Sequence, residues 1–379
     1  MLQNAATRAA WLRVTSIWLA VLTEKTDFDI GATGLLMDTG LDRPTYGSRL
    51  NSVSTDTLAF PLPTLDSLEE AAALIYRHMP ATPQYRWPLL DRRAGAAVWV
   101  KHENHTPTGA FKVRGGLIYL HELCRAGEKP EGVVSASTGN HGQSIGFAAR
   151  KYGVRAAVVV PQGNSVEKNA AMQALGVELI VRGRDFQEAH ECADEICAQR
   201  GWHRFPSFDA TLVRGVGTYA LELFRTVKEI HTVYVPVGMG SGLCGVIAAR
   251  DALGLDTRIV GVASQHAPAF ALAFKEGRVM THESTTRIAD GIACRTVYES
   301  PLTIARHGAE RVVQVSDDEV ESAMRALFAD THNTAEGGGA AALAALLQEK
   351  DQMRGRTVAV ILSGGNVNSD AFSRILAAG

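Results

Sequence analysis

The sequence predicts an α/β fold of two domains, each containing a mostly parallel sheet covered by helices. Three observations support this prediction. The chain has 379 residues, more than one compact core usually serves. From about residue 60 onward, short apolar segments alternate with segments of helical periodicity. Several apolar segments are almost continuous, which is typical of strands buried on both faces.

The first elements of this pattern lie near residue 100. Residues 97–100 predict a short strand. Val113, Leu117, Leu120 and Cys124 follow at spacings of four, three and four residues. These spacings place the four side chains on one face of a helix. We therefore expect a strand followed by a helix.

The predicted elements then alternate along the chain. Gly153 and Gly176 are expected to end helices with left-handed caps. Two helix starts resemble capping boxes: Asn164 with Glu167, and Ser316 with Glu319. The further strands are expected at residues 132–135, 154–160, 177–181, 232–237, 258–263 and 357–362, and the further helices at about residues 145–152, 164–175, 243–253, 316–329 and 337–350.

Composition and charge exclude several classes of protein. The 38 Lys and Arg residues nearly balance 40 Asp and Glu residues, so no global field would attract nucleic acid. The five cysteines are scattered without a CxxC pair. We therefore expect no disulfide framework and no zinc knuckle, but a reduced cytoplasmic setting. The apolar run at residues 17–22 is too short to span a membrane.

Residues 1–58 do not continue the alternating pattern. No acidic residue occurs before Glu24, and Arg8 and Arg13 precede the short apolar run, as in some targeting peptides. Residues 31–57 are rich in Gly, Ser, Thr and Asp without periodicity. We expect a poorly ordered leader, with a targeting peptide as the alternative.

Three glycine-bearing turns follow predicted strands, where parallel sheets bind their ligands. Residues 135–143 (SASTGNHGQ) could hold a carboxylate at a helix start, although an ordinary capped helix explains them equally well. Residues 238–243 (GMGSGL) lack the Walker lysine. Ser264 and Gln265 stand where a dinucleotide fold needs an acid, so a phosphate cradle fits better than a nucleotide-dependent oxidoreductase. The third turn, residues 363–366 (SGGN), is weak evidence alone.

Lys112 is the candidate nucleophile. It is predicted in the first turn of a helix, beside Phe111 and Val113. The positive helix end and the apolar neighbours both disfavour the charged amine and should lower its pKa. A lowered pKa is what a Schiff-base amine needs. Most helical lysines are merely solvated, so Lys112 gains weight only in combination with the three turns.

Together, the lysine segment and the three turns resemble the fold-type II (tryptophan synthase β-like) pyridoxal-phosphate enzymes. The branch that they resemble most is that of threonine dehydratase and serine racemase. The resemblance runs from about residue 62 to the C-terminus. It depends on residues 103–115 (ENHTPTGAFKVRG), 137–143 (STGNHGQ), 238–243 and 363–366 in this order.

The resemblance implies a role for each site residue. Lys112 would hold the cofactor as a Schiff base and later remove the substrate α-proton. Thr138 stands where the racemase has its second acid–base serine, but its β-branch restricts the hydroxyl and disfavours racemisation. The implied cofactor-binding residues are Phe111, Lys112, Asn140, Gly238, Met239, Gly240, Ser241, Gly242, Glu336 and Ser363, and the implied substrate-binding residues are Ser137, Thr138, Asn140, His141 and Cys294.

The implied reaction is elimination of the β-hydroxyl from L-threonine, L-serine or a close analogue, giving a 2-oxo acid and ammonia. Ser363 cannot keep a proton on the pyridine nitrogen as a carboxylate would, which favours elimination over transamination. Only residues 367–379 follow Asn366, so we expect no regulatory domain and a catabolic role. The racemase's metal ligands would fall at Ser264, Pro268 and Phe270, so we expect no metal site.

Several alternatives remain at this point. Cys294 occupies a side-chain pocket position and could favour a less polar β-substituent, although a buried packing cysteine explains it equally well. A second enzymatic alternative is a bulkier substrate, such as a phenylserine or 3-hydroxyaspartate. Racemisation, β-replacement and a non-catalytic cofactor carrier are the other possibilities. The resemblance also implies a homodimer, with a large cofactor-binding domain (residues 59–131 and 203–379) and a small inserted domain (residues 132–202).

Overall fold

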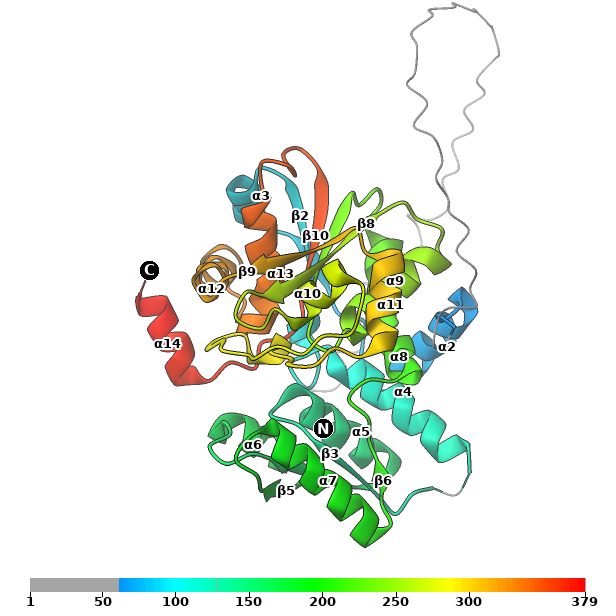
Figure 1. Ribbon diagram of the computed structural model, residues 1–379. Helices are drawn as coiled ribbons and strands as arrows, with labels where there is room; N and C mark the ends of the chain where they lie inside the picture. Colours follow the sequence, from blue (N-terminus) through cyan, green and yellow to red (C-terminus); the bar gives the residue numbers. More distant parts are fainter. Residues whose placement is uncertain (1–60, 128, 379) are drawn as a thin grey trace, which may run out of the picture. The chain divides into compact units, whose positions relative to one another are not determined.

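The computed structural model describes residues 61–127 and 129–378. The predicted leader, residues 1–58, lies outside the described residues. Figure 1 shows the order of the elements along the described chain. Within the described part, no helix is long and apolar enough to cross a membrane.

The larger sheet has six strands in the order β1-β2-β10-β7-β8-β9. Five of them pair in parallel, whereas the edge strand β1 pairs antiparallel with β2. The parallel strands β2, β7, β8 and β10 were predicted from the apolar runs, but the sequence pattern did not predict the two edge strands β1 and β9. The strands are β1 (Gln84–Arg86), β2 (Ala97–His102), β7 (Thr232–Pro236), β8 (Arg258–Ser264), β9 (Arg311–Val315) and β10 (Thr357–Leu362).

The second sheet has four parallel strands in the order β5-β4-β3-β6. All four come from one continuous stretch of the chain, residues 132–204. They are β3 (Gly132–Ala136), β4 (Arg155–Val160), β5 (Glu178–Val181) and β6 (His203–Arg204). The mixed α/β fold with parallel sheets is therefore confirmed.

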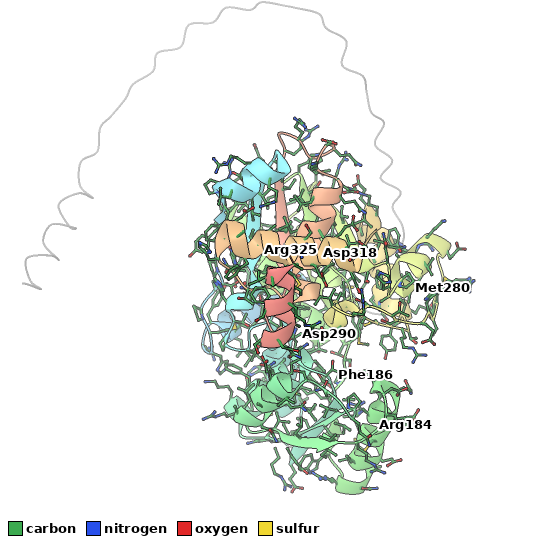
Figure 2. All side chains as sticks on the ribbon, turned by 90° about the vertical axis from the view of Figure 1, so that its left-hand side faces the viewer. Arg184, Phe186, Met280, Asp290, Asp318 and Arg325 are labelled. Carbon is green, nitrogen blue, oxygen red and sulfur yellow. The ribbon has the colours of Figure 1, made fainter. Side chains whose placement is uncertain are left out.

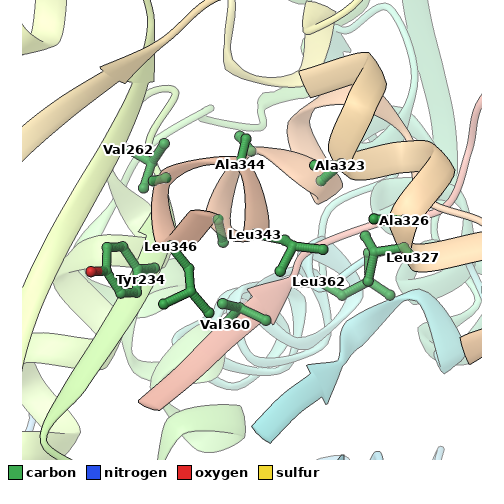
Figure 3. Packing of buried hydrophobic residues seen from close by; sticks show 14 of the residues in the cluster. Tyr234, Val262, Ala323, Ala326, Leu327, Leu343, Ala344, Leu346, Val360 and Leu362 are labelled. Atoms are coloured by element: carbon green, nitrogen blue, oxygen red, sulfur yellow. The ribbon is translucent and has the colours of Figure 1, made fainter. Parts of the chain in front are cut away.

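The larger sheet is buried on both faces. Along β10, Val360 and Leu362 belong to one hydrophobic cluster, whereas Ala359 and Ile361 belong to another on the opposite face. This alternation follows from the two-residue repeat of a strand. Figure 3 shows Leu343 of helix α13 (Gly337–Gln348) packed beside β10 in the first cluster. Burial on both faces explains why the strand sequences are almost continuously apolar.

Helices surround the two sheets. They include α4 (Lys112–Arg125), α5 (Asn140–Tyr152), α6 (Val166–Ala174), α8 (Ala210–Thr226), α9 (Ser241–Ala252) and α12 (Asp317–Thr331). The others are α2 (Leu65–Ile75), α3 (Pro88–Ala94), α7 (Phe186–Arg200), α10 (Ala269–Glu276), α11 (Glu299–Gly308) and α14 (Ser369–Ala377), with short 3₁₀ turns η2 (Glu103–His105) and η3 (Asp290–Ile292).

One of the two predicted capping boxes is confirmed. Ser316 accepts a hydrogen bond from the Glu319 N–H, and the Glu319 side chain bonds back to the Ser316 N–H. The box predicted at Asn164 is wrong. Helix α6 is capped instead by the next residue, Ser165, which accepts from the Lys168 N–H at 3.1 Å. Both Asn and Ser are good capping residues, so the sequence alone could not place the cap.

Candidate active site

The largest collection of predicted site residues surrounds a cavity of about 140 Å³. Its walls include residues at the carboxyl ends of β3, β7 and β10, the strands before the three glycine-bearing turns. This agrees with the expectation that ligands bind at the carboxyl ends of parallel strands.

The structure brings nearly all of the predicted site residues to this cavity. The exception is Gly242, which is not part of the lining, although its carbonyl accepts a hydrogen bond from the buried Tyr219 hydroxyl at 3.2 Å. The predicted residues that line the cavity are Phe111, Lys112, Ser137, Thr138, Asn140, His141, Gly238, Met239, Gly240, Ser241, Cys294, Glu336 and Ser363.

Helices α4, α5, α9 and α13 each begin at the cavity wall. In none of them does the N-cap side chain accept a hydrogen bond from the helix backbone. The first turns of helices carry N–H groups without intrahelical partners and the positive end of the helix dipole. The cavity is therefore suited to anionic groups such as phosphate or carboxylate.

Lys112 is the first residue of α4 and is half-buried. Its Nζ lies 3.5 Å from Ser241 Oγ and 5.3 Å from the centre of the Phe111 ring. Among the described residues, the Lys112 amine has no ion-pair partner. Burial lowers its pKa, although the nearby Cys294 thiol acts in the opposite direction. The lowered pKa predicted from the sequence is thus confirmed.

The glycine turn after β7 has no room for a side chain at Gly240. Gly240 adopts φ +103°, a left-handed conformation that favours glycine. A Cβ atom at this position would also lie only 2.6 Å from Pro301 Cβ. Its successor Ser241 starts α9, so this tight turn presents the helix N-terminus to the cavity.

A chain of amide and carboxylate groups crosses the cavity wall. Asn366 donates to Asn140 at 2.8 Å, and Asn140 donates to Glu336 Oε1 at 2.6 Å. The other oxygen, Glu336 Oε2, is buried without a partner among the described residues. Burial raises the pKa of Glu336 to about 7, while Lys168 partly opposes this effect. Glu336 can therefore hold a proton near neutral pH.

Two polar side chains have defined places on the turn between β3 and α5. Ser137 Oγ accepts hydrogen bonds from the N–H groups of Gly139 and Gly142, at 3.2 and 2.9 Å. The His141 ring packs edge-on against Phe205, and its Nε2 atom is buried without a partner among the described residues. Burial lowers the pKa of His141 to about 3, so its imidazole is neutral at pH 7.

Two further predicted side chains, Cys294 and Ser363, are also neutral. Burial raises the pKa of Cys294 to about 11, so its sulfur stays a thiol at neutral pH. Ser363 is buried, and its hydroxyl donates a long hydrogen bond of 3.4 Å to the Gly338 carbonyl.

Sequence reasoning missed an ion pair at the cavity. Lys168, in the first turn of α6, pairs with Asp290 of η3. Burial lowers the pKa of Lys168, but the charges of Asp290 and Glu336 outweigh this effect and raise it overall. Figure 2 labels Asp290 and Phe186, another unpredicted lining residue. No local pattern marks these residues, because they meet only through the packing of distant segments.

The comparisons with known proteins agree with this geometry. Residues 75–364 match the family model described as pyridoxal-phosphate dependent enzyme. The chain belongs to this family. The predicted family and its cofactor, pyridoxal phosphate, are thereby confirmed.

Individual relatives within and around this family are similar over most of the chain. The L-threonine ammonia-lyase of Thermotoga maritima is 30% identical over 83% of this chain and 78% of its own length. The solved processed form of threonine deaminase isoform 2 from Solanum lycopersicum has a TM-score of 0.76 at 28% identity, covering 84% of this chain and 95% of that one. Maize serine racemase has a TM-score of 0.78 at 26% identity, covering 84% and 98%.

The cavity of this pyridoxal-phosphate enzyme fits its cofactor. A lysine amine with lowered pKa lines the cavity, and a glycine-bearing turn at a helix N-terminus, where Gly240 has no room for a side chain, suits the phosphate. Glu336, whose buried Oε2 atom has no partner among the described residues, also belongs to the cavity wall.

Proposed function

We propose that this enzyme is an ammonia-lyase that converts a small 3-hydroxy amino acid, such as L-threonine or L-serine, to a 2-oxo acid and ammonia. The main observation that supports this proposal is that Lys112 and Ser363 line the same cavity. Lys112 has a lowered pKa and faces the glycine turn, while a neutral hydroxyl instead of a carboxylate follows β10.

Each wall of the cavity has a proposed part in holding the cofactor. Residues 238–242 and the N-terminus of α9 would bind the phosphate through backbone N–H groups. Lys112 would form the covalent link, and Phe111 would pack beside the ring. Asn140, held by Glu336 and Asn366, would bind the ring hydroxyl. When bound, the cofactor supplies an electron sink that acidifies the substrate α-hydrogen.

The substrate carboxylate is proposed to lie at the N-terminus of α5. Ser137 is fixed there by two backbone N–H groups, which leaves its hydroxyl hydrogen free to donate. Thr138, Asn140 and His141 complete this surface. Because the His141 imidazole is neutral, it contributes no positive charge, and the helix dipole supplies the electrostatic attraction.

Two side chains, Lys112 and Glu336, can accept or hold a proton during elimination. Burial lowers the pKa of Lys112, which favours the uncharged amine, and in that form its Nζ can accept the α-proton. Glu336 can hold a proton at its unpartnered Oε2, since its pKa lies at about 7. Ser363 bears no charge that would retain a proton on the pyridine nitrogen, and this favours early departure of the β-hydroxyl.

Relatives support the reaction type. The Thermotoga maritima relative is named an L-threonine ammonia-lyase, and the tomato structure is a threonine deaminase. A second candidate is racemisation, because the maize relative is a serine racemase and Thr138 places a hydroxyl in the cavity. Cys294 lies in the cavity wall and leaves the preferred substrate side chain open, so dehydration of a bulkier 3-hydroxy amino acid is a third candidate.

One assay distinguishes these candidates. Purified enzyme with pyridoxal phosphate is incubated with L-threonine, L-serine, phenylserine and 3-hydroxyaspartate. We expect a hydrazone-reactive 2-oxo acid from threonine or serine, with little D-enantiomer by chiral chromatography. If the D-enantiomer is the main product, racemisation and not elimination is the activity of the enzyme. If no substrate gives a 2-oxo acid, the proposed function is refuted.

We further propose a cytoplasmic homodimer in which residues 132–202 form a small domain inserted between residues 59–131 and 203–379. The proposal of an inserted domain is supported by the continuous stretch that forms the second sheet, although its last strand β6 (His203–Arg204) extends two residues beyond the proposed bound at residue 202. Sedimentation equilibrium of the purified protein tests the dimer, because a monomer at micromolar concentration would contradict it.

A further inference from the structure

Directly behind the cavity lies a cluster of four charged residues that the proposed mechanism does not use. We name Lys101, Glu103, Arg114 and Glu222 the inner charge cluster. Three of these side chains have no exposed surface, and that of Glu222 is only 6% exposed. None of the four lines the cavity, so none can touch the substrate or the cofactor.

The inner charge cluster is balanced and densely hydrogen-bonded. The Arg114 guanidinium binds Glu103 through two nitrogens at 2.7 and 2.9 Å, and Glu222 through two contacts at the same distances. Lys101 Nζ binds Glu222 at 2.5 Å and the Thr82 carbonyl at 2.7 Å. Two cations thus face two anions, and Glu103 and Arg114 form a forked pair with fixed directions.

Stability alone is a weak explanation for such a cluster. Moving ions out of water is expensive, and well-packed apolar residues of similar volume often stabilise a core equally well or better. A guanidinium fork differs from an apolar side chain because its hydrogen bonds fix both distance and direction. The cluster is therefore better suited to setting geometry than to adding stability.

The geometry that it can set is that of the first turn of α4. Arg114 follows Lys112 by two residues, about 200° around the helix, so the two side chains leave α4 on opposite sides. Lys112 enters the cavity while Arg114 enters the cluster. No N-cap side chain fixes this helix start. Arg114 instead ties it to η2 through Glu103 and to α8 through Glu222 and Thr218.

Helix α8 extends this connection to the glycine turn. Gly215 lets α8 approach closely, because a Cβ there would lie 2.5 Å from the Arg114 carbonyl oxygen. One residue beyond Thr218, Tyr219 donates to the Gly242 carbonyl and packs edge-on against Phe111. The same stretch of α8 therefore contacts both the lysine helix and the turn proposed to hold the phosphate.

We propose that Arg114 is a positioning residue, which through Glu103 and Glu222 holds the first turn of α4 so that Lys112 Nζ faces the glycine turn. The proposal rests on the proposed function, in which Lys112 is the reacting amine. A displacement of a reacting group by about 1 Å can slow a reaction by roughly 100-fold, even when the reacting groups themselves are unchanged. Loss of the fork should therefore slow the reactions of Lys112 and leave substrate binding almost unchanged.

The test compares Arg114→Lys with the wild-type holoenzyme. Lysine keeps the charge but cannot form the two-pronged contacts. Attachment of pyridoxal phosphate to Lys112 is followed over time by borohydride reduction and mass spectrometry of the Lys112 peptide, independently of turnover. We expect slower attachment and a kcat lower by about 10- to 100-fold, with KM within about threefold of wild type.

A second variant and a control complete the experiment. Glu222→Gln keeps the volume of the side chain but weakens its charge contacts. We expect a smaller loss of attachment rate and kcat than in Arg114→Lys. This variant tests the proposal if Arg114→Lys fails to fold. Tyr76→Phe removes a hydroxyl that donates to the same Glu222 carboxylate at 3.0 Å from an exposed ring. This control should match wild type in attachment rate and kcat.

The outcomes separate the two proposals. A folded Arg114→Lys enzyme with wild-type attachment and kcat overturns the positioning role, as does a lower Tm with unchanged kcat per folded molecule. If wild-type protein itself does not attach the cofactor at Lys112, the proposed function fails instead.

Discussion

At the scale of single residues, the strongest prediction concerns Lys112. Lys112→Ala should abolish covalent attachment of the cofactor and lower turnover by more than about 10³-fold, because the α-proton acceptor is lost together with the link. The fold should persist, since this amine has no ion-pair partner among the described residues. Visible absorbance, 2-oxo-acid release and far-ultraviolet circular dichroism measure the three effects. Retained turnover would contradict the assignment.

His141 has a different expected effect. His141→Ala should raise KM for the amino acid by about 10-fold and change kcat little, because a hydrogen bond to a carboxylate binds ground and transition states alike. Steady-state kinetics separates the two constants. A fall in kcat at unchanged KM would instead indicate that His141 takes part in proton transfer.

Glu336 gives the protein a pH-dependent stability. In the folded chain, burial raises its pKa to about 7, above its ordinary value of 4.5. Folding therefore favours the protonated carboxyl, and this stabilisation is fully present below pH 4.5 and is lost as the pH rises to about 7. Relative to Glu336→Gln, the wild-type cofactor-free protein should lose on the order of 3 kcal/mol of unfolding free energy across this window. Urea denaturation at several pH values measures the difference, and parallel curves would contradict it.

At the scale of elements, Gly240 in the turn before α9 is expected to tolerate no side chain. Gly240→Ala adds a Cβ against Pro301 at a positive φ, so we expect a loss of about 1–3 kcal/mol in stability and at least 10-fold weaker binding of pyridoxal phosphate. Gly254→Ala is the matched control, because its φ is +62° but no atom lies within 4 Å of the added Cβ. Equilibrium dialysis of the cofactor should distinguish them, and equal affinities would contradict the prediction.

Helices and strands could be predicted where their physical cause is local and can be recognised in the sequence. The strands at residues 155–160 and 357–362 are apolar because both of their faces are buried, and Gly153 ends α5 in a left-handed conformation. The cap of α6 was missed by one residue, because Asn164 turns to the Thr138 carbonyl while Ser165 caps the helix. That choice depends on a neighbouring turn and not on the helix itself.

At the scale of the whole molecule, the motif residues of the site were predictable from the sequence, because each motif resembles one of known function. The inner charge cluster was not. Lys101, Arg114 and Glu222 are far apart in the chain and look like ordinary surface charges until the packing of α4 against α8 buries them together. The pair of Lys168 with Asp290 was missed for the same reason.

The contacts of α6 lead to a prediction about the whole molecule. Its first turn bonds to distant segments through Lys168 with Asp290, Ser165 with Asn368, and Glu167 with Ser369. Asp290→Asn removes the charge partner of a lysine whose side chain is only 12% exposed. Because Asp290 itself is half exposed to solvent, we expect a loss of only about 1 kcal/mol in stability.

The larger effect of Asp290→Asn should be local. The amides of α6 should exchange hydrogen several-fold faster, because one of the bonds that hold its first turn is gone, while the amides of β10 keep their protection. KM should rise, since the Lys168 side chain lines the substrate cavity and would no longer be fixed. Asp351→Asn, which breaks an exposed pair with Arg354, is the control and should change neither exchange nor KM. Unchanged exchange in α6 would show that Asp290 does not hold this helix at the cavity.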